Sequence, residues 1–412
     1  MMKSPSCLLS INNYFYPRGG AEVLFLEQNR LFEGIGWDVV PFAMRHANNL
    51  PSPWAEYFPD EIELGGGYGL AGNLLRAQRV IFSMQARRKM RELLDRVQPR
   101  IAHAHNIYHH LSPSILPMLR KRGIPVVMTV HDLKLACPAY TMMADNLPCE
   151  RCRGGKIHNV AVNRCIKGSL ALSSLVMVET FVHRLLRLYE ANVSRFVVPS
   201  RFVLEKLVQW GWARERFTYI PNFVDVERFR PNQAIGGRFV YCGRLQSLKG
   251  VETLVRAAAL ARQPLTMVGS GPEEIRLRQL SEDLGADVRF LGHQTKAALV
   301  DVIQSARAIV VPSECNENAP LALLEGYAAG RPVIGSRMAG IPELVREGET
   351  GALFAAGEVE ALAASLERFA ALPDTRLAEM GAAGRRWVEQ DFTAASYRDR
   401  LLALYGSLGN HG

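Results

Sequence analysis

The amino-acid sequence predicts an α/β protein made of two Rossmann-like domains, each a doubly wound parallel sheet, which face one another across a cleft. Short apolar runs alternate with amphipathic helical patterns along most of the 412 residues, as in chains of βα units. Glycine-rich or charged loops follow several of these runs, at the strand ends where open α/β sheets bind ligands. A chain of this length can bury two separate hydrophobic cores.

The composition is that of an ordinary globular protein, with 48% hydrophobic and 22% charged residues, so a disordered chain is not expected. No apolar run approaches the roughly 18 residues of a membrane-spanning helix. The apolar segment near the N-terminus is too short for a signal peptide, and we therefore expect a cytoplasmic protein. The odd number of cysteines, seven, also argues against a disulfide framework.

The net charge of +9 is unevenly distributed along the chain. Residues 1–230 contain 30 Lys and Arg against 19 Asp and Glu, whereas residues 231–412 contain 19 against 21. The basic first half is therefore expected to meet an acidic partner or surface, unless its cations only form a solvated face.

The first domain is expected over residues 1–225. Its short apolar runs are followed by loops rich in Gly, Pro or Asn, and the segments between them repeat apolar residues at helical spacing. Strands are predicted at 7–11, 37–42, 100–103, 125–130, 195–198 and 217–220, and helices at 20–32, 70–97, 113–121, 168–192 and 200–210.

Gly19 and Gly20 lie between the first strand and the helix that follows it. A Gly-Gly pair lets the backbone approach a ligand closely, with the N–H groups of the helix behind it. On these residues alone, a tight turn without a ligand is the simpler explanation.

The segment 70–97 combines an apolar face with many cations. A basic amphipathic helix can lie on an anionic membrane surface, or it can pack its apolar face into the domain and leave its cations in water. The two arrangements are compatible, because a packed helix can still present a basic face to lipid. The cations are Arg76, Arg79, Arg87, Arg88, Lys89, Arg91 and Arg96.

His131 follows the strand predicted at 125–130, in the sequence Thr-Val-His-Asp, and so lies at the ligand-binding edge of the sheet. A single histidine is more often a polar residue satisfied by its neighbours than part of a site. The preceding strand and its loop contain four further histidines, for which we prefer a structural role or one in binding a second substrate. These are His103, His105, His109 and His110.

The segment between the strand end and residue 168 loses periodicity and holds four cysteines, in the spacing Cys-x11-Cys-x2-Cys-x12-Cys. Four thiolates can enclose a tetrahedral zinc ion and order a long loop that has little core of its own. Buried thiols without a metal are the alternative, and His158 could replace one cysteine as a ligand. The cysteines are Cys137, Cys149, Cys152 and Cys165.

The second domain is expected over residues 226–390, after a loop-like boundary. Its strands are predicted at 238–242, 265–268, 288–291, 308–311 and 333–335, each followed by a helical pattern, with more helices from residue 358 onward. A last segment, residues 391–412, contains a helix at about 393–408.

Arg244 and Lys249 lie in a glycine-bounded loop directly after the strand predicted at 238–242. Two cations at a strand end can neutralise a diphosphate leaving group. A surface loop with two charges is the alternative. Gly269, in a Gly-x-Gly after the next strand, is only a weak signal for a phosphate.

The stretch 312–331, PSECNENAPLALLEGYAAGR, follows the strand predicted at 308–311 and contains a helical pattern over about 319–330. Pro320 suits the first helical turn, and the free N–H groups at this helix start favour a phosphate. Glu325 would then lie about 9 Å further along the axis, at the reach of a ribose. Glu317, before the helix, would face the group attached to the outer phosphate. This arrangement fits a nucleotide-diphosphate sugar.

The spacing Glu317-x7-Glu325 is weak alone but specific in its context, because residues 339–343, AGIPE, and the pair Gly348-x-x-Gly351 follow it. With these motifs the chain resembles the family 4 retaining glycosyltransferases of the GT-B fold. The likeness extends over most of the chain, with its elements in the family's order. It implies that the second domain binds the nucleotide sugar and the first domain the acceptor, and that the last helix crosses back to the first domain.

The resemblance also implies roles for individual residues. His131 would reach the donor sugar near the acceptor hydroxyl, and the pair Arg244 and Lys249 matches the family's Arg-x4-Lys-Gly pattern. The expected catalytic residues are Glu317, His131, Arg244 and Lys249. The expected donor-binding residues are Gly19, Gly20, Arg244, Lys249, Gly269, Asn318, Ala319, Pro320, Leu321 and Glu325.

The activity implied is transfer of a sugar from a UDP- or GDP-linked donor to a saccharide or lipid-linked saccharide, with retention of anomeric configuration, in cell-surface polysaccharide biosynthesis. We expect no catalytic metal and no nucleic-acid partner, a cysteine-bearing insertion at about 133–167 on the acceptor side, and a peripheral position on the inner face of the membrane. Two alternatives stay open. They are a nucleotide-sugar 2-epimerase of the same fold and a non-catalytic module that binds a glycan or a nucleotide.

Overall fold

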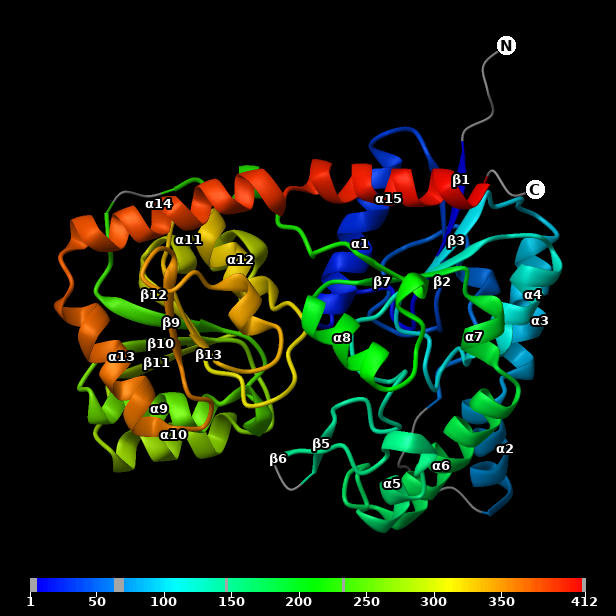
Figure 1. Ribbon diagram of the computed structural model, residues 1–412, viewed down its shortest axis with the longest axis horizontal. Helices are drawn as coiled ribbons and strands as arrows, with labels where there is room; N and C mark the ends of the chain where they lie inside the picture. Colours follow the sequence, from blue (N-terminus) through cyan, green and yellow to red (C-terminus); the bar gives the residue numbers. More distant parts are fainter. Residues whose placement is uncertain (1–5, 63–69, 145–146, 232–233, 410–412) are drawn as a thin grey trace.

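The structure is a computed structural model that describes residues 6–62, 70–144, 147–231 and 234–409. These residues form two lobes, each built on a six-stranded parallel sheet with helices on both faces (Figure 1). The predicted fold class, two doubly wound Rossmann-like sheets in an α/β protein, is confirmed.

The first sheet has the strand order β2-β1-β3-β4-β7-β8, and all of its neighbouring strands are parallel. The order reverses between β1 and β3, so the loops that follow these two strands diverge and leave a crevice at their carboxyl ends. The strands are β1 (Cys7–Ile11), β2 (Asp38–Phe42), β3 (Ile101–Ala104), β4 (Val126–Thr129), β7 (Arg195–Val198) and β8 (Phe217–Tyr219).

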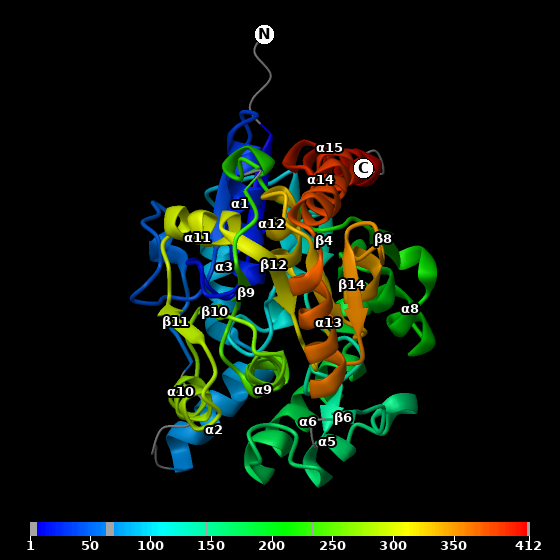
Figure 2. The same ribbon diagram turned by 90° about the vertical axis from the view of Figure 1, so that its left-hand side faces the viewer.

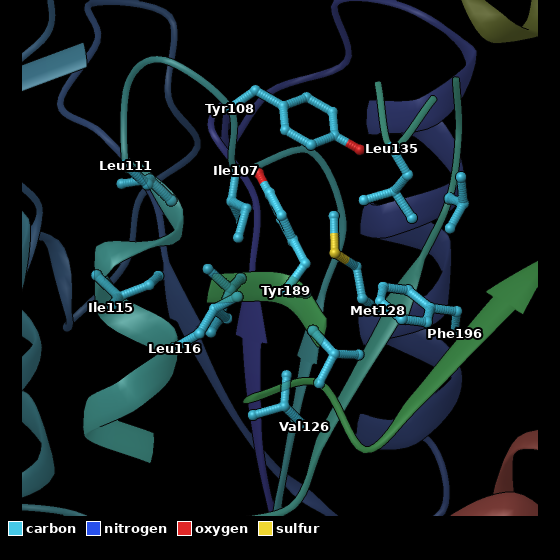
Figure 3. Packing of buried hydrophobic residues seen from close by; sticks show 14 of the residues in the cluster. Ile107, Tyr108, Leu111, Ile115, Leu116, Val126, Met128, Leu135, Tyr189 and Phe196 are labelled. Carbon is cyan, nitrogen blue, oxygen red and sulfur yellow. The ribbon is translucent and has the colours of Figure 1, made fainter. Parts of the chain in front are cut away.

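Helices surround the first sheet. They are α1 (Gly20–Glu33), α2 (Leu70–Ile81), α3 (Met84–Leu94), α4 (Leu116–Lys121), α6 (Leu170–Leu185), α7 (Leu188–Asn192) and α8 (Arg201–Gln209). On one face of the sheet, Met128 and Phe196 pack against Leu116 and Tyr189, with all four side chains buried (Figure 3). Burial of a large apolar side chain stabilises the fold by about 1.5–3 kcal/mol, so this core holds the strand ends in place.

Two helices predicted as continuous are interrupted. The segment 70–97 forms α2 and α3, because the Ser83 hydroxyl accepts a hydrogen bond of 3.1 Å from Ala86 N and starts a new helix. The segment 168–192 forms α6 and α7, with Arg187 in the left-handed region at φ 48° between them. Part of the expected loop before α2, residues 63–69, lies outside the described residues.

The second sheet has the order β11-β10-β9-β12-β13-β14, again with parallel neighbours. Its order reverses between β9 and β12, so the crevice of this lobe opens at the carboxyl ends of those two strands. The strands are β9 (Arg238–Cys242), β10 (Leu265–Val268), β11 (Val288–Gly292), β12 (Ala306–Val311), β13 (Val333–Ser336) and β14 (Gly351–Phe354). The strand β14 was not predicted.

Between these strands lie α9 (Val251–Leu260), α10 (Glu274–Asp283), α11 (Lys296–Gln304) and α12 (Leu321–Ala328). The chain then continues through α13 (Val359–Ala371) and α14 (Asp374–Asp391). The last helix, α15 (Ala394–Gly409), lies over the first lobe, whereas α14 lies over the second (Figures 1 and 2). Leu401 and Tyr405 of α15 are buried against Leu8 and Phe32 of the first lobe.

The chain passes between the lobes twice, and the two passages lie side by side. Val224 N donates a hydrogen bond of 3.0 Å to Phe392 O, and Val224 also pairs with Thr393 as an isolated parallel bridge. No helix within the described ranges is long and apolar enough to cross a membrane.

Residues 133–167, the cysteine insertion, project from the first lobe below α8 (Figure 1). They contain two short antiparallel strands, β5 (Met143–Ala144) and β6 (Leu147–Pro148), and a short helix, α5 (Asn159–Val162). The insertion has little regular structure, so its order depends on contacts with its neighbours and on its own side chains.

Candidate active site

The crevice of the second lobe is formed by the loops after β9 and β12. The β12 loop leads to α12, with Pro320 as the residue before the helix at φ −66° and ψ 124°. The helix therefore begins two residues later than predicted, because Pro320 keeps extended backbone and does not enter the first turn. Glu325 lies four residues along α12 from its first residue, or about 6 Å instead of about 9 Å.

Glu317 and Lys249 meet in this crevice. The Lys249 ammonium donates a hydrogen bond to Glu317 Oε1, which also accepts one of 2.8 Å from the Ser313 hydroxyl. Burial alone would lower the pKa of Lys249, but the Glu317 carboxylate outweighs it, and the pKa is raised. Lys249 is therefore cationic at every physiological pH and is held at the strand end.

Arg244 is exposed in the same loop. The loop after β10 supports the Arg244 loop through a backbone hydrogen bond of 3.0 Å, which Leu245 N donates to Ser270 O. Gly269 has φ +125°, and a Cβ there would lie 2.0 Å from Gly243 O. Only glycine fits at this position. The structure thus gives Gly269 a part in shaping the Arg244 loop.

The glycine pair of the first lobe lies opposite the start of α12. A Cβ on Gly20 would lie 3.8 Å from Leu321 Cδ1, and one on Gly19 would lie 3.3 Å from Glu22 Oε2. Glu22 is buried, and burial raises its pKa, while Arg18 and Arg244 oppose this. Glu22 was missed in the sequence, where its only signal is its position one turn after the glycine pair.

Glu325 lines a small pocket between the lobes, with Glu27 and Arg228 among the other lining residues. Burial raises the pKa of Glu325, and Arg228 and Lys296 partly offset this. The Glu27 carboxylate joins the two cations, at 2.7 Å from Lys296 Nζ and 3.3 Å from Arg228. Glu325 therefore faces a pocket lined by both apolar and charged side chains, the charged ones being Glu27, Asp225 and Arg228. Glu27, Arg228 and Lys296 were missed in the sequence.

His131 lies just beyond β4, and its Nε2 atom is 2.8 Å from His105 Nδ1. The two rings are stacked, with centroids 5.1 Å apart. Burial lowers the pKa of His131 to about 4, so the imidazole is neutral at physiological pH. Among the described residues, His105 Nε2 is buried and has no hydrogen-bond partner.

The tautomers follow from that unpaired atom. A buried N–H without an acceptor is rarer than a buried acceptor without a donor, so the His105 proton belongs on Nδ1, where it is donated to His131. His131 then accepts through Nε2 and carries its own proton on Nδ1. The neutral ring is thus a hydrogen-bond donor for a ligand.

The other histidines belong to buried contacts of the first lobe. His103 stacks on His105 with centroids 4.7 Å apart, and its ring nitrogens lie 2.5 Å from the Tyr405 hydroxyl and 2.7 Å from Thr129 Oγ1. His109 lies 3.1 Å from the buried Glu179 carboxylate. His103 thereby joins β3 and β4 to the C-terminal helix, which is a structural role.

Asn318 connects the two lobes. Its Nδ2 donates a hydrogen bond of 2.8 Å to Val130 O, directly before His131, and its Oδ1 accepts one of 2.6 Å from the Ser200 hydroxyl. Asn318 is one of the residues predicted to bind the donor, and both polar groups of its side chain are paired with protein partners. Nearby, Asn222 Nδ2 donates a hydrogen bond of 2.8 Å to Ala319 O.

Glu343 makes a second connection between the lobes. Its carboxylate accepts hydrogen bonds of 2.8 Å from Arg201 N and 2.5 Å from Phe202 N, the first free N–H groups of α8. A carboxylate at a helix N-terminus also interacts favourably with the helix dipole. Glu343 lies in the AGIPE motif, but its role as a cap could not be seen from sequence.

The two crevices therefore oppose each other. The second lobe contributes the cations Arg244 and Lys249, the N-terminus of α12 and the half-buried carboxylate of Glu325. The first lobe contributes the pair Gly19 and Gly20 and the neutral ring of His131. Cations and free N–H groups suit a diphosphate, and a carboxylate further along the helix suits vicinal hydroxyls. Together with the two facing Rossmann-like lobes, these features define a glycosyltransferase of the GT-B fold.

Two family models match the chain. "Glycosyltransferase Family 4" matches residues 18–228, about half of the sequence, and "Glycosyl transferases group 1" matches residues 236–371. The chain belongs to glycosyltransferase family 4.

Curated relatives agree with this assignment. A D-inositol 3-phosphate glycosyltransferase of Saccharomonospora viridis is 31% identical over 243 residues, which cover 52% of this chain and 56% of that protein. The lipopolysaccharide core biosynthesis glycosyltransferase LpsE of Rhizobium meliloti is 32% identical over 236 residues, covering 53% and 66%. The chain thus spans about half the length of the curated relatives it matches.

Solved structures share the fold over the whole chain. Sucrose-phosphate synthase from Thermosynechococcus elongatus superposes with a TM-score of 0.73 at 21% identity, covering 99% of this chain and 100% of that one. Anabaena HepE in complex with UDP and glucose superposes with a TM-score of 0.68 at 17% identity, covering 98% and 100%. At these identities the likeness establishes the GT-B fold alone.

Proposed function

We propose that this protein transfers a sugar from a nucleotide-diphosphate sugar to a saccharide or lipid-linked saccharide acceptor, with retention of anomeric configuration. The observation that carries the proposal is the contact between Lys249 and Glu317 beside the start of α12, with Glu325 in a pocket between the lobes along the same helix. One bound molecule with a diphosphate, a ribose and a sugar can use all of these groups at once.

The diphosphate is bound by cations and backbone in this proposal. Arg244 and Lys249 neutralise the charge that develops as the sugar leaves, and the free N–H groups at the start of α12 bind phosphate oxygens. Glu325 accepts hydrogen bonds from the ribose hydroxyls. With two cations and a helix N-terminus in place, the leaving group requires no catalytic metal.

Retention follows if the acceptor attacks from the face that the diphosphate leaves. The leaving phosphate oxygen takes the proton from the acceptor hydroxyl while the new glycosidic bond forms on that face. Glu317 and the Nδ1–H of His131 hold the sugar hydroxyls from opposite lobes. An NMR assay of donor and product checks this, and an inverted anomeric configuration in the product rules the mechanism out.

The acceptor is proposed to be a precursor of a cell-surface polysaccharide, handled by the basic first half of the chain. The relative LpsE, named for lipopolysaccharide core biosynthesis, supports this class of acceptor. A lipid-linked acceptor would place the enzyme at the inner face of the membrane. Flotation with anionic vesicles tests that position, since an enzyme that acts only on free saccharides should stay unbound.

The donor is tested by thermal shift and turnover. A nucleotide sugar at 100 times its dissociation constant adds about 2.7 kcal/mol of stability, which gives a measurable rise in Tm. UDP-sugars are the first to screen, because HepE was solved with UDP and with UDP-glucose, and GDP-sugars come next. Turnover of the donor without any acceptor would indicate the epimerase instead, and no shift with any donor would overturn the proposal.

A further inference from the structure

The four cysteines of the insertion line one cavity, together with Met143 and Trp210 among other residues. They come from three separate stretches of the insertion, 12 and 13 residues apart on either side of the Cys-x2-Cys pair. The space inside the cavity is about 10 Å³, close to the smallest volume that accepts a single water molecule. The cavity is therefore of a size for one atom or ion and too small for an organic ligand.

The four cysteines are in the thiol form, two of them buried and two partly exposed. Cys137 and Cys152 are the buried pair. A cation bound among such thiols deprotonates those that coordinate it.

The backbone near the cysteines is unusual. Left-handed backbone occurs at Tyr140 and Met142 after the first cysteine, at Gly154 and Gly155 after the pair, and on either side of the last cysteine. The last two positions are Arg164 (φ 45°) and Lys167 (φ 50°). Non-glycine residues in this region cost free energy and persist only where surrounding interactions hold them. In the insertion these include backbone hydrogen bonds such as Cys149 N to Met142 O (2.8 Å) and Cys165 N to Val160 O (3.0 Å).

Among metal ions, zinc suits this set of ligands. Four thiolates, two of them in a Cys-x2-Cys pair, are the ligands of closed tetrahedral zinc sites. As placed in the described residues, no three His, Cys, Asp or Glu side chains already form a metal-holding group. The thiols must therefore turn inward about their Cα–Cβ bonds to reach the Zn–S distance of about 2.3 Å. All four already line the same cavity.

The insertion touches the loop that carries Glu317. Asn316 Nδ2, from the second lobe, donates a hydrogen bond of 2.9 Å to Thr141 O in the insertion. On the other side, Lys206 of α8 pairs at 2.7 Å with Glu150, directly after Cys149. The insertion thus spans from α8 to the residue before Glu317, and a rigid insertion fixes the position of that loop.

We propose that Cys137, Cys149, Cys152 and Cys165 bind one structural zinc ion, which orders the insertion and thereby positions the Asn316–Glu317 loop across the cleft. Binding converts four thiols to thiolates and releases their protons to solvent, with no change of oxidation state. The metal takes no part in sugar transfer.

Metal content tests the site without reference to activity. Full-length protein purified without chelator should contain one zinc per chain by elemental analysis, and cobalt exchange should give thiolate-to-cobalt absorption with the intense visible bands of a tetrahedral site. The double variant C149S/C152S should lose the metal. The control Cys7→Ser, in β1 and outside the cavity, should keep it.

A conservative variant separates loss of a zinc ligand from misfolding of the insertion. Cys165→His preserves a zinc ligand and should retain the metal, whereas Cys165→Ser should bind it more weakly. Wild-type protein that carries no metal after growth with zinc, or that contains a Cys149–Cys152 disulfide as isolated, overturns the proposal.

The positioning role has its own readout. In wild-type background, Asn316→Ala should lower the transferase kcat by about tenfold, since the loop loses the hydrogen bonds of Asn316 Nδ2 to the insertion, of which the shortest contributes roughly 1–1.5 kcal/mol. In the C149S/C152S background the same substitution should have little further effect, because the insertion no longer fixes Thr141. Equal effects of Asn316→Ala in both backgrounds would contradict the positioning role. The kinetic test rests on the proposed sugar transfer, whereas the zinc measurements do not depend on it.

Discussion

At the scale of single residues, the contact between Lys249 and Glu317 is the most informative, because it joins the loops after β9 and β12 at the point where the strand order reverses. A Lys and a Glu at that point hold each other in place before a ligand arrives. In the proposed reaction, this contact would orient the lysine toward the developing charge of the leaving group before the donor binds.

Lys249→Ala should lower kcat by about 10²–10³-fold, because the diphosphate then leaves without its nearest cation. Steady-state kinetics with saturating donor measure this. Lys121→Ala, an exposed lysine at the end of α4, is the matched control and should have wild-type kinetics. Unchanged kcat in Lys249→Ala would remove Lys249 from the catalytic residues.

Glu325→Gln should weaken donor binding roughly 10- to 100-fold, because a hydrogen bond to a charged group contributes about 1.5–3 kcal/mol. Titration calorimetry with the donor and with its 2′-deoxyribose analogue checks the role. If Glu325 binds the ribose, the deoxy analogue should bind the wild type less tightly and should show a smaller loss in the variant.

The raised pKa of Glu325 gives a dependence on pH. As pH falls through that pKa, the Glu325 carboxylate is protonated and loses its capacity to accept the proposed ribose hydrogen bonds. Donor affinity should therefore begin to decline at a higher pH than it would if the pKa of Glu325 were unshifted. Glu325→Gln should flatten this decline. An identical pH profile in wild type and variant would show that another group titrates.

His105→Phe should keep the stacking on His131 but remove the N–H that orients it, lowering kcat by about tenfold for a hydrogen bond of roughly 1–1.5 kcal/mol. The readout that separates positioning from loss of stability is the nitrogen NMR spectrum of His131. We expect the Nδ1–H tautomer in the wild type and a mixture in the variant. An unchanged tautomer would contradict the role.

Some of these residues could be predicted from sequence and others could not. Arg244 and Lys249 could be predicted, because they lie in the loop directly after an apolar run that predicts a strand. Residues in that position lie at the carboxyl edge of the sheet, where ligands bind. The hydrogen bonds of Asn318 and Glu343 between the lobes could not be predicted. Their partners, Val130 O and the N-terminus of α8, come from the other lobe. Contacts between distant segments leave no local pattern in the chain.

At the scale of elements, strand prediction was close because buried parallel strands are short apolar runs with clear ends. β1, β7, β9 and β10 have their predicted bounds. Helix bounds were less accurate, since a serine cap or one left-handed residue interrupts a helix without changing its apolar periodicity. β14 was missed because its four residues include a glycine and an alanine and resemble a loop.

Glu343→Ala should lower the free energy of unfolding by about 0.5–2 kcal/mol, the usual effect of removing an N-terminal cap, since α8 loses the acceptor of its first N–H groups. Chemical denaturation measures the change. Glu347→Ala is the matched control, because Glu347 pairs with Arg337 on the surface and its loss should cost less than about 0.5 kcal/mol. Equal effects would mean that Glu343 acts only as a surface charge.

At the scale of the whole molecule, the first lobe needs a segment that the sequence places far away. α15 comes last in the chain, yet Leu401 and Tyr405 are part of the core of the first lobe. The Tyr405 hydroxyl also reaches His103, so the C-terminal helix is linked to the stacked histidines that end at His131. This arrangement makes the first lobe incomplete until α15 has been synthesised.

Leu401→Ala should therefore destabilise the first lobe by about 2–5 kcal/mol, as expected for a cavity in a packed core. Hydrogen exchange should show the loss in β1 and α1 and not only in α15. Leu402→Ala, at a partly exposed neighbouring position, should have a smaller effect. Protection lost only within α15 would indicate that the helix is an independent appendage.

The two passages between the lobes, joined where Val224 contacts Phe392 and Thr393, restrict how the molecule can open. Two chain segments that cross side by side between two lobes can act as a hinge. When a donor enters or a product leaves, one lobe should therefore rotate relative to the other about these passages. The largest displacement should occur at the edge of the lobes farthest from α15. Spin labels on that edge should report a change of separation when nucleotide is added, and labels beside residue 224 should report none.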